Sequence, residues 1–242
     1  MKIAVIGGTG LIGSQVVRNL NAAGHEAVPH SKSTGVDVIS GRGLEEAVAG
    51  ADVVVNLTNS PTFDDASPAF FQTSMDNLLA AARKGHVGHV VILSIVGTDQ
   101  VPELDYYRAK ALQERLLAAG AIPYSIVRAT QFMEFIDAVL SWTADADTVR
   151  LPATPIQPIA SKDVAAAVAE VAAGAPLNGI RAIAGPDILP LDELGRITLA
   201  HKGDHRTVVT DPTAGMFAAV KGGVLTDNDA HLAATRYADW LS

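Results

Sequence analysis

Cysteine is absent from the 242 residues of this chain, and acidic side chains outnumber basic ones. The lack of cysteine excludes disulfides, thiolate metal sites and cysteine nucleophiles. The formal net charge of −8 argues against direct nucleic-acid binding, because phosphate recognition needs a basic face. No uninterrupted apolar run reaches the roughly 18 residues of a membrane-spanning helix, so we expect no membrane partner.

Several catalytic patterns are also missing. The seven histidines do not show the H-E-x-x-H spacing of a zinc site, and no Gly-x-Ser-x-Gly elbow of a serine hydrolase occurs. We therefore predict no metal. The first expected strand begins at residue 2 and leaves no room for a signal peptide, so we expect a cytoplasmic protein. A small-molecule substrate and a monomer or homodimer are the expected partners.

A glycine-rich stretch opens the chain, with the sequence MKIAVIGGTGLIG. Its apolar run is typical of a parallel strand covered on both faces, and the glycines follow at once. In such a loop the first glycine permits a tight turn, and the second lets the backbone approach a pyrophosphate. The third lets the following helix pack closely on the strand. We predict a dinucleotide site whose contacts are Gly7, Thr9, Gly10, Leu11, Ile12 and Gly13.

Strand and helix patterns alternate after this stretch, which is typical of a doubly wound parallel sheet. The expected fold class is α/β, a Rossmann sheet with a small C-terminal substrate-covering part. We expect residues 1–129 and 159–185 to form the dinucleotide-binding core, and residues 130–158 and 186–242 to form the substrate-binding part. The six principal strands are expected at 2–6, 25–29, 36–39, 51–57, 89–94 and 122–128.

The end of the second expected strand bears on the choice between NAD and NADP. A carboxylate there usually binds the 2′-hydroxyl of the adenosine ribose of NAD. Here Ser31 and Lys32 follow the strand, and no acidic residue occurs from position 30 until Asp37. Hydroxyls and an ammonium suit a 2′-phosphate, so the sequence favours NADP(H) over NAD(H). Asp37 is placed to accept from the adenine amino group, although a capping role explains it equally well.

Two further groups of polar residues follow expected strands. Ligands of open α/β sheets bind at the carboxyl ends of strands. Small polar residues follow the strand at 51–57, where they would border the nicotinamide-side ribose. The residues after the strand at 122–128 would approach the nicotinamide or the substrate, although their apolar members fit a core role as well. The predicted contacts are Asn56, Leu57, Thr58 and Thr130 for the cofactor, and Gln131 and Phe132 for the substrate.

Tyr106 and Lys110 lie four positions apart on one expected helix. This spacing brings a phenol beside an ammonium. A neighbouring cation lowers the pKa of a tyrosine from its reference value near 10, which suits the phenol to proton transfer. The lysine can also bind a ribose hydroxyl. Alone, Tyr-x-x-x-Lys is a weak signal that a surface pair often explains, but its place after the fifth strand makes it more specific.

With these residues, the chain resembles the extended and atypical short-chain dehydrogenase/reductases, especially their NmrA-like NAD(P)H-binding branch. The likeness rests on the glycine loop, Asn56, Asn77, Tyr106-x-x-x-Lys110 and the stretch 128–132. It implies that Tyr106 is the general acid/base for hydride transfer at a carbonyl. It also implies that Lys110 binds the nicotinamide ribose and that a serine orients the substrate.

The serine of that family pattern is not uniquely placed in this sequence. Ser94 ends the fifth expected strand, about two residues before the usual position, which Val96 occupies here. Either Ser94 supplies the hydroxyl as a catalytic residue, or Thr98 replaces it at the substrate, or the site lacks one.

The residues and the resemblance together predict an NADP(H)-dependent oxidoreductase acting on a small carbonyl, quinone or enone. A non-catalytic NAD(P)H-binding redox sensor of the NmrA-like type is the alternative, because the serine is displaced. An NAD-dependent epimerase or dehydratase ranks last, since the chain is short for a sugar-nucleotide domain.

Overall fold

The computed structural model describes residues 1–220 and 222–242. The chain divides into two units. The first comprises Met1–Arg128 and Val164–Arg181, and the second comprises Ala129–Asp163 and Ala182–Ser242. The dinucleotide-binding core and the substrate-binding part expected from the sequence stay predictions.

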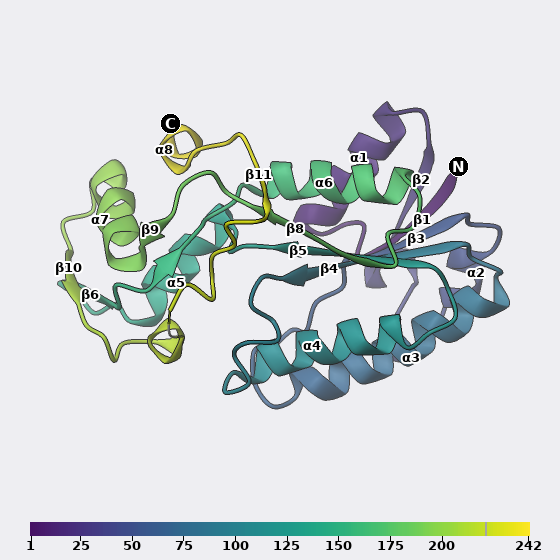
Figure 1. Cartoon of the computed structure of the whole chain (residues 1–242), viewed down its shortest axis with the longest axis horizontal. Helices are drawn as coiled ribbons and strands as arrows, with labels where there is room; N and C mark the ends of the chain where they lie inside the picture. Colours follow the sequence, from purple (N-terminus) through teal and green to yellow (C-terminus); the bar gives the residue numbers. More distant parts are fainter. Residues whose placement is uncertain (221) are drawn as a thin grey trace. The chain divides into compact units, whose positions relative to one another are not determined.

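A seven-stranded sheet, counted over the described residues, has the order β11-β8-β5-β4-β3-β1-β2 (Figure 1). Neighbouring strands run parallel in the pairs β1 with β2, β1 with β3, β3 with β4, and β8 with β11. The predicted Rossmann-like α/β fold is therefore confirmed. The strands of this sheet are β1 (Lys2–Ile6), β2 (Glu26–His30), β3 (Val53–Asn56), β4 (His89–Ile95), β5 (Tyr124–Ala129), β8 (Gly179–Ala184) and β11 (His231–Leu232).

Helices cover both faces of the sheet in the first unit. Figure 1 shows α1 and α6 over one face and α3 and α4 over the other. The helices of this unit are α1 (Leu11–Ala22), α2 (Leu44–Val48), α3 (Ser67–Lys84), α4 (Asp105–Ala118) and most of α6 (Ser161–Ala173), with a short 3-10 helix η1 (Lys32–Thr34).

The core of the first unit explains the continuous apolar runs of the sequence. Ile6, Val54 and Ile92 come from three neighbouring strands and pack with Met75 and Leu78 of α3. Each of these side chains is almost fully buried. A strand that is covered on both faces needs apolar residues at consecutive positions, which is why the pattern does not alternate.

The strand order reverses between β1 and β3. The chain runs from β1 to β2 on one side and then returns to β3 on the other side of β1. In open α/β sheets this reversal opens a crevice at the carboxyl ends of the two strands, where ligands bind. The glycine loop follows β1 and the residues from Leu57 onward follow β3, so both lead into this crevice.

The expected strand at residues 36–39 is wrong. Val38 and Ile39 lie in a turn, and none of the four residues belongs to a strand. The amides of Val36 and Asp37 donate to the carbonyl oxygens of Ser31 and Arg42, both at 2.9 Å. Asn77 donates from Nδ2 to the carbonyl oxygens of Val38 and Ile39 at 3.0 and 2.9 Å. Gly35 and Gly41 on either side have positive φ, which turns the chain away from an extended path. Val36 and Val38 are buried in the core, and this burial accounts for the apolar pattern without a strand.

The second unit is built from short strands and helices. Its pairs are β6 with β10 in parallel and β7 with β9 antiparallel. The elements are η2 (Met133–Phe135), α5 (Ile136–Trp142), β6 (Thr148–Leu151), β7 (Pro155–Ile156), β9 (Leu189–Pro190), α7 (Leu191–Lys202), β10 (Thr207–Thr210), η3 (Met216–Ala219) and α8 (Tyr237–Leu241).

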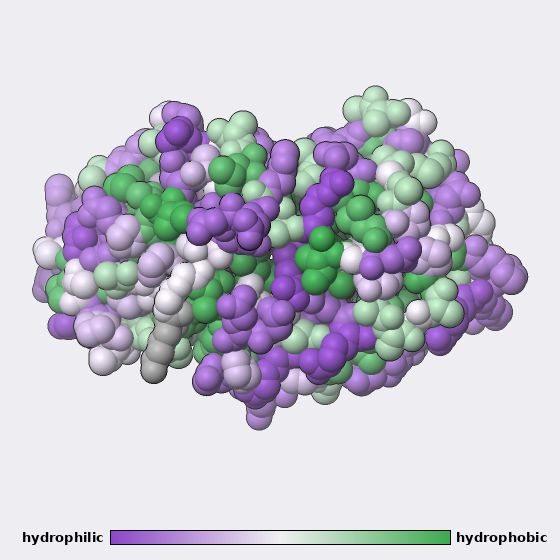
Figure 2. Space-filling model, in the orientation of Figure 1, coloured by the Kyte–Doolittle hydropathy of each residue, from purple (hydrophilic) through white to green (hydrophobic). Residues whose placement is uncertain are grey.

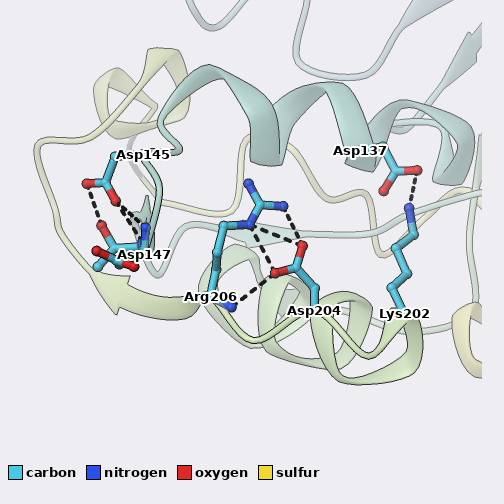
Figure 3. A network of polar contacts seen from close by, with 7 residues as sticks. Asp137, Asp145, Asp147, Lys202, Asp204 and Arg206 are labelled. Carbon is cyan, nitrogen blue, oxygen red and sulfur yellow. Dashed lines mark hydrogen bonds and ion pairs between the residues drawn. The ribbon is translucent and has the colours of Figure 1, made fainter.

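Charged contacts join the elements of this second unit (Figure 3). Lys202 at the end of α7 pairs with Asp137 of α5, and Arg206 pairs with Asp204 in the turn before β10. Asp145 accepts from the backbone amides that start β6, at 2.9 and 2.7 Å. These contacts lie at the surface, so each adds little to stability, and they serve mainly to fix the turns.

Apolar and polar residues are interspersed on the face drawn in Figure 2. Large apolar side chains that stay exposed, such as Leu11, Phe63 and Trp142, come from different elements. No described helix combines the length and apolar character needed to cross a membrane.

Candidate active site

The glycine loop is tightly constrained by its neighbours. Gly7 has a φ of 82°, which side-chain-bearing residues rarely adopt. A Cβ added to Gly13 would lie 2.2 Å from the carbonyl oxygen of Gly7. A Cβ added to Gly8 would lie 2.7 Å from Pro29 of β2. Glycine is therefore required at these positions for the helix and both strands to meet.

Gly10 differs from the other glycines of the loop. It precedes α1 with extended backbone angles, and an added Cβ would contact only the Gly7 carbonyl oxygen, at 3.4 Å. The first turn of α1 carries no acidic side chain and no side-chain cap. The N–H groups of that turn have no partner within the helix, and the helix dipole favours an anion there.

A cavity of about 450 Å³ lies beside this loop, entirely within the first unit. Its polar lining residues come from the glycine loop and from the segments after β2 and β3. Its apolar lining residues come from β1, from residues 36–39, from the segment after β3 and from α3. The lining residues are Ile6, Gly7, Thr9, Gly10, Ser31, Lys32, Val36, Val38, Ile39, Leu57, Thr58, Asn59, Pro61 and Phe70.

Many predicted cofactor contacts therefore meet at one cavity, although they come from distant parts of the sequence. Gly7, Thr9, Gly10, Ser31, Lys32, Leu57 and Thr58 all line it. Leu11, Ile12, Gly13, Asp37 and Asn56, all in the described part of the chain, are not among its lining residues. Gly13 and Asn56 instead shape the loops that do line it.

Lys32 lines the cavity and pairs with Asp37, which does not line it. The Lys32 side chain is 75% exposed, and its ammonium lies 3.9 Å from the Asp37 carboxylate. Asp37 accepts the amide of Ile39 at 2.9 Å, and this hydrogen bond lowers the pKa of its carboxyl group. This contact joins residues two positions apart within a loop and caps no helix, so both roles expected of Asp37 stay predictions. Lys32 is the one charged residue among the described residues that line the cavity.

Asn56 organises the loop after β3. Its side chain is buried, and its Oδ1 accepts both the amide and the hydroxyl of Thr58, at 3.1 and 2.8 Å. Its Nδ2 lies 3.5 Å from the sulfur of Met75. The amide group of Asn56 is thus used within the protein, and it holds Thr58 in the cavity wall.

Tyr106 lies in the first turn of α4, and its hydroxyl donates to Oδ1 of Asn59 at 2.8 Å. Its ring contacts Phe63 edge-on, with centroids 4.9 Å apart, and Phe71 at 6.4 Å. Burial raises the pKa of Tyr106 to about 12, against a smaller lowering by the hydrogen bond to Asn59. The expectation that Lys110 lowers this pKa is wrong.

Lys110 is buried and bonded elsewhere, which explains that difference. Its ammonium donates to the carbonyl oxygen of Leu93 at 2.7 Å and to Oε1 of Gln113. It also lies 4.8 Å from the ring centroid of Phe71. Burial lowers the pKa of Lys110 to about 7, while Glu114 acts in the opposite direction. A lysine that is half neutral near pH 7 contributes little charge to a neighbouring phenol.

Ser94 and Thr98 differ in how their hydroxyls are bonded. Thr98 donates to the carbonyl oxygen of Ile95 at 2.5 Å, so its hydroxyl closes a local turn. Ser94 is 1% exposed, and its Oγ has no hydrogen-bond partner among the residues described. By the alternation of the strand, Ser94 shares a face with Val90 and Ile92, which pack toward α3. A buried hydroxyl without a partner is rare and is often explained by a missing ligand.

Thr130, Gln131 and Phe132 belong to the second unit. The Thr130 amide donates to Ile183 at 3.2 Å, and the Gln131 carbonyl accepts from Ile159 at 2.9 Å. Within the described residues, Thr130 Oγ1 and Gln131 Oε1 are buried without hydrogen-bond partners. Their assignment to cofactor and substrate stays a prediction.

The sequence did not predict the hydrogen bond between Asn59 and Tyr106, nor that the apolar residues at 36–39 line the cavity. Asn59 is 47 positions from Tyr106, and no local pattern joins two residues at that separation. Residues 36–39 were expected to form a strand. The apolar character of Val36 and Val38 was the only sign in the sequence that they are buried.

Comparisons with known proteins agree with this geometry. A sequence profile described as NAD(P)H-binding matches residues 7–174, from the glycine loop to the end of α6. The chain belongs to the NAD(P)H-binding family. The glycine loop and the cavity fit a nucleotide of this family, because the uncapped start of α1 suits a pyrophosphate and the apolar lining residues suit a base.

Solved structures of NAD(P)-dependent enzymes share the fold of this NAD(P)H-binding protein. The NADPH-dependent quinone oxidoreductase of Escherichia coli has a TM-score of 0.71 and 18% identity, over 99% of this chain and 98% of that one. A nucleoside-diphosphate-sugar epimerase of Staphylococcus aureus has a TM-score of 0.72 and 17% identity, over 100% and 99%. The Citrobacter triphenylmethane reductase complexed with NADP(H) has a TM-score of 0.68 and 18% identity, over 88% and 80%. At such identities the likeness shows the fold.

A curated relative is the photosystem II assembly factor Ycf39 of Synechocystis. It is 26% identical over 151 residues, which cover 55% of this chain and 46% of Ycf39. The chain therefore spans less than half the length of that relative.

Proposed function

We propose that this protein is an NADP(H)-dependent oxidoreductase that transfers a hydride to or from a small carbonyl, quinone or enone. One observation carries the proposal. The Tyr106 hydroxyl is bonded to Asn59, and Asn59 lines the cavity beside the glycine loop. A proton donor therefore lies next to the cavity in which the nucleotide would bind. The fold shared with a quinone oxidoreductase and a triphenylmethane reductase supports the same class of reaction.

The residues of the chain would handle the proton in this reaction. When bound, the reduced nicotinamide supplies the hydride. Tyr106 donates its phenolic proton to the substrate oxygen, so that a carbonyl gains one hydride and one proton and becomes an alcohol. Solvent then returns a proton to the phenolate. A pKa of about 12 keeps Tyr106 protonated at neutral pH, which is the state required for donation.

Ser94 and Lys110 would assist Tyr106. Ser94 orients the substrate oxygen, and its buried hydroxyl without a partner supports this role. Lys110 binds the nicotinamide ribose. For this role its ammonium would exchange one present acceptor, the Leu93 carbonyl or the Gln113 amide, for a ribose hydroxyl.

The proposed preference for NADPH rests on the end of the cavity that follows β2. Ser31 and Lys32 line it, and the Lys32 side chain is 75% exposed. Its ammonium lies 3.9 Å from the Asp37 carboxylate and would exchange this contact for a 2′-phosphate. Asp37 keeps its hydrogen bond to the amide of Ile39. This arrangement offers a cation and a hydroxyl where an NAD enzyme offers a carboxylate.

A non-catalytic role is the second candidate. The similarity to Ycf39, a photosystem II assembly factor, favours it. It would place the chain in the NmrA-like branch, as a protein that binds NAD(P)H and reports the redox state to a protein partner. Tight NADPH binding without turnover of any quinone, enone or aldehyde in a panel would support this candidate over the enzyme.

Tyr106→Phe tests the proposed function. The variant keeps the ring that packs against Phe63 and Phe71 but removes the proton donor. We expect kcat with NADPH and 1,4-benzoquinone, an enone or an aldehyde to fall about 100-fold, as is typical for loss of a general acid. Turnover equal to that of the wild type would disprove the role of Tyr106.

A further inference from the structure

The loop between β3 and α3 supplies Tyr106 with a polar and an aromatic contact. Asn59 Oδ1 accepts a hydrogen bond from the phenol at 2.8 Å, and Phe63 of the same loop packs edge-on at 4.9 Å. The loop itself is fixed at both ends. Asn56 holds the backbone and hydroxyl of Thr58, and Ser67 Oγ donates to the carbonyl oxygen of Thr62 at 2.7 Å. The Asn59 amide is therefore presented from an ordered segment.

Asn59 also belongs to the wall of the nucleotide cavity, whereas Lys110 does not appear among the described lining residues. Lys110 gives its hydrogen bonds to Leu93 and Gln113. The hydrogen-bond partner of the Tyr106 hydroxyl is thus the side-chain amide of Asn59, from the loop after β3. It is not Lys110, one helical turn away.

We infer that Asn59 is the positioning residue for Tyr106 in the proposed oxidoreductase and holds the phenol at the edge of the nucleotide cavity. This inference rests on the proposed function. An amide carries an acceptor and a donor on the same group. Its oxygen accepts from the neutral phenol, and a half-turn of the amide presents N–H to the phenolate that forms after proton donation. Asn59 can therefore stabilise Tyr106 before and after the proton leaves.

The test is a double-mutant cycle between Asn59→Ala and Tyr106→Phe, measured as kcat with NADPH and 1,4-benzoquinone. We expect Asn59→Ala to lower kcat about tenfold in the wild-type background and to have no further effect in the Tyr106→Phe background, because it acts through the phenol. Asn19→Ala, on an exposed part of α1, is the matched control and should leave kcat unchanged. An equal loss in both backgrounds would overturn the inference.

The Asn59→Asp variant separates positioning from a merely structural role. A carboxylate accepts from the phenol but repels the phenolate, so it should raise the pKa of Tyr106. In protein labelled with 13C at the tyrosine Cζ, the Tyr106 signal should begin to change toward that of the phenolate at a higher pH in Asn59→Asp than in the wild type. An onset at the same pH in both proteins would count against the inference.

An NMR measurement tests the contact between Asn59 and Tyr106 even if the protein does not turn over a substrate. The protein is labelled with 13C at the Cζ atom of its tyrosines. The signal of Tyr106 is identified as the one that is lost in Tyr106→Phe. We expect Asn59→Ala to shift this signal by more than those of Tyr107, Tyr124 and Tyr237. An unshifted Tyr106 signal would overturn the inference. Failure of the proposed function would appear separately, as wild-type turnover in Tyr106→Phe.

Discussion

At the scale of single residues, burial decides the charge states in this candidate site more than the spacing of charged groups does. Tyr106 and Lys110 are neighbours on α4, and the sequence predicted that the cation would lower the pKa of the phenol. Instead, burial moves the two pKa values in the directions that favour neutral groups, to about 12 and about 7. The protein thus holds a neutral proton donor beside a lysine that carries only a partial charge at neutral pH.

The lowered pKa of Lys110 predicts how stability depends on pH. The unfolded lysine keeps its proton up to its ordinary pKa of 10.5, whereas the folded one releases it above about 7. The unfolded state therefore binds more protons in that window, and the free energy of unfolding rises with pH. The rise cannot exceed about 1.4 kcal/mol per pH unit. Urea unfolding at pH 7 and pH 9 should show it.

Lys110→Met provides the comparison for that experiment, because it keeps an unbranched side chain without the titrating group. The difference in unfolding free energy between pH 7 and pH 9 should be smaller in Lys110→Met than in the wild type. The same difference in both proteins would show that Lys110 is charged in the folded state.

At the scale of elements, the glycines of the loop have two roles, since one is required for packing and another for nucleotide binding. Gly13 packs so closely on the Gly7 carbonyl oxygen that no side chain fits, whereas Gly10, which lines the cavity, leaves room for a methyl group. The two glycines are three residues apart but serve different purposes.

Alanine at each of the two positions tests this distinction. Gly13→Ala should lower the thermal midpoint by several degrees and weaken NADPH binding, because α1 must move away from the loop. Gly10→Ala should keep the thermal midpoint within about a degree but weaken NADPH binding at least tenfold, since the methyl group meets the ligand and not the protein. A Gly10→Ala variant that binds NADPH normally would contradict this account of the cavity.

The elements were predictable wherever one local pattern dominated. The glycine loop and the buried strands before and after it follow from apolar runs and glycine spacing. Residues 36–39 were not predictable as a turn, because their buried valines look like those of a strand. In the structure their backbone groups are bonded within the loop and to the Asn77 side chain of α3 instead of to a strand.

At the scale of the whole molecule, the order of the strands explains why the site lies where it does. The reversal between β1 and β3 brings the glycine loop, the end of β2 and the loop after β3 to one cavity. Alternation of strands and helices was sufficient to predict this architecture. The hydrogen bond from Tyr106 to Asn59 was not predictable, because it joins residues from α4 and from the loop after β3 that only the folded sheet brings together.

The central claim is that the cavity beside the glycine loop binds NADPH, with Lys32 at the 2′-phosphate. The most direct test is a titration of the purified protein with NADPH and with NADH, followed by nicotinamide fluorescence. We predict saturable binding of both, with NADPH bound at least tenfold more tightly, and loss of that preference in Lys32→Ala. Equal or tighter binding of NADH would contradict the assignment of Lys32, and no binding of either nucleotide would contradict the account of the cavity itself.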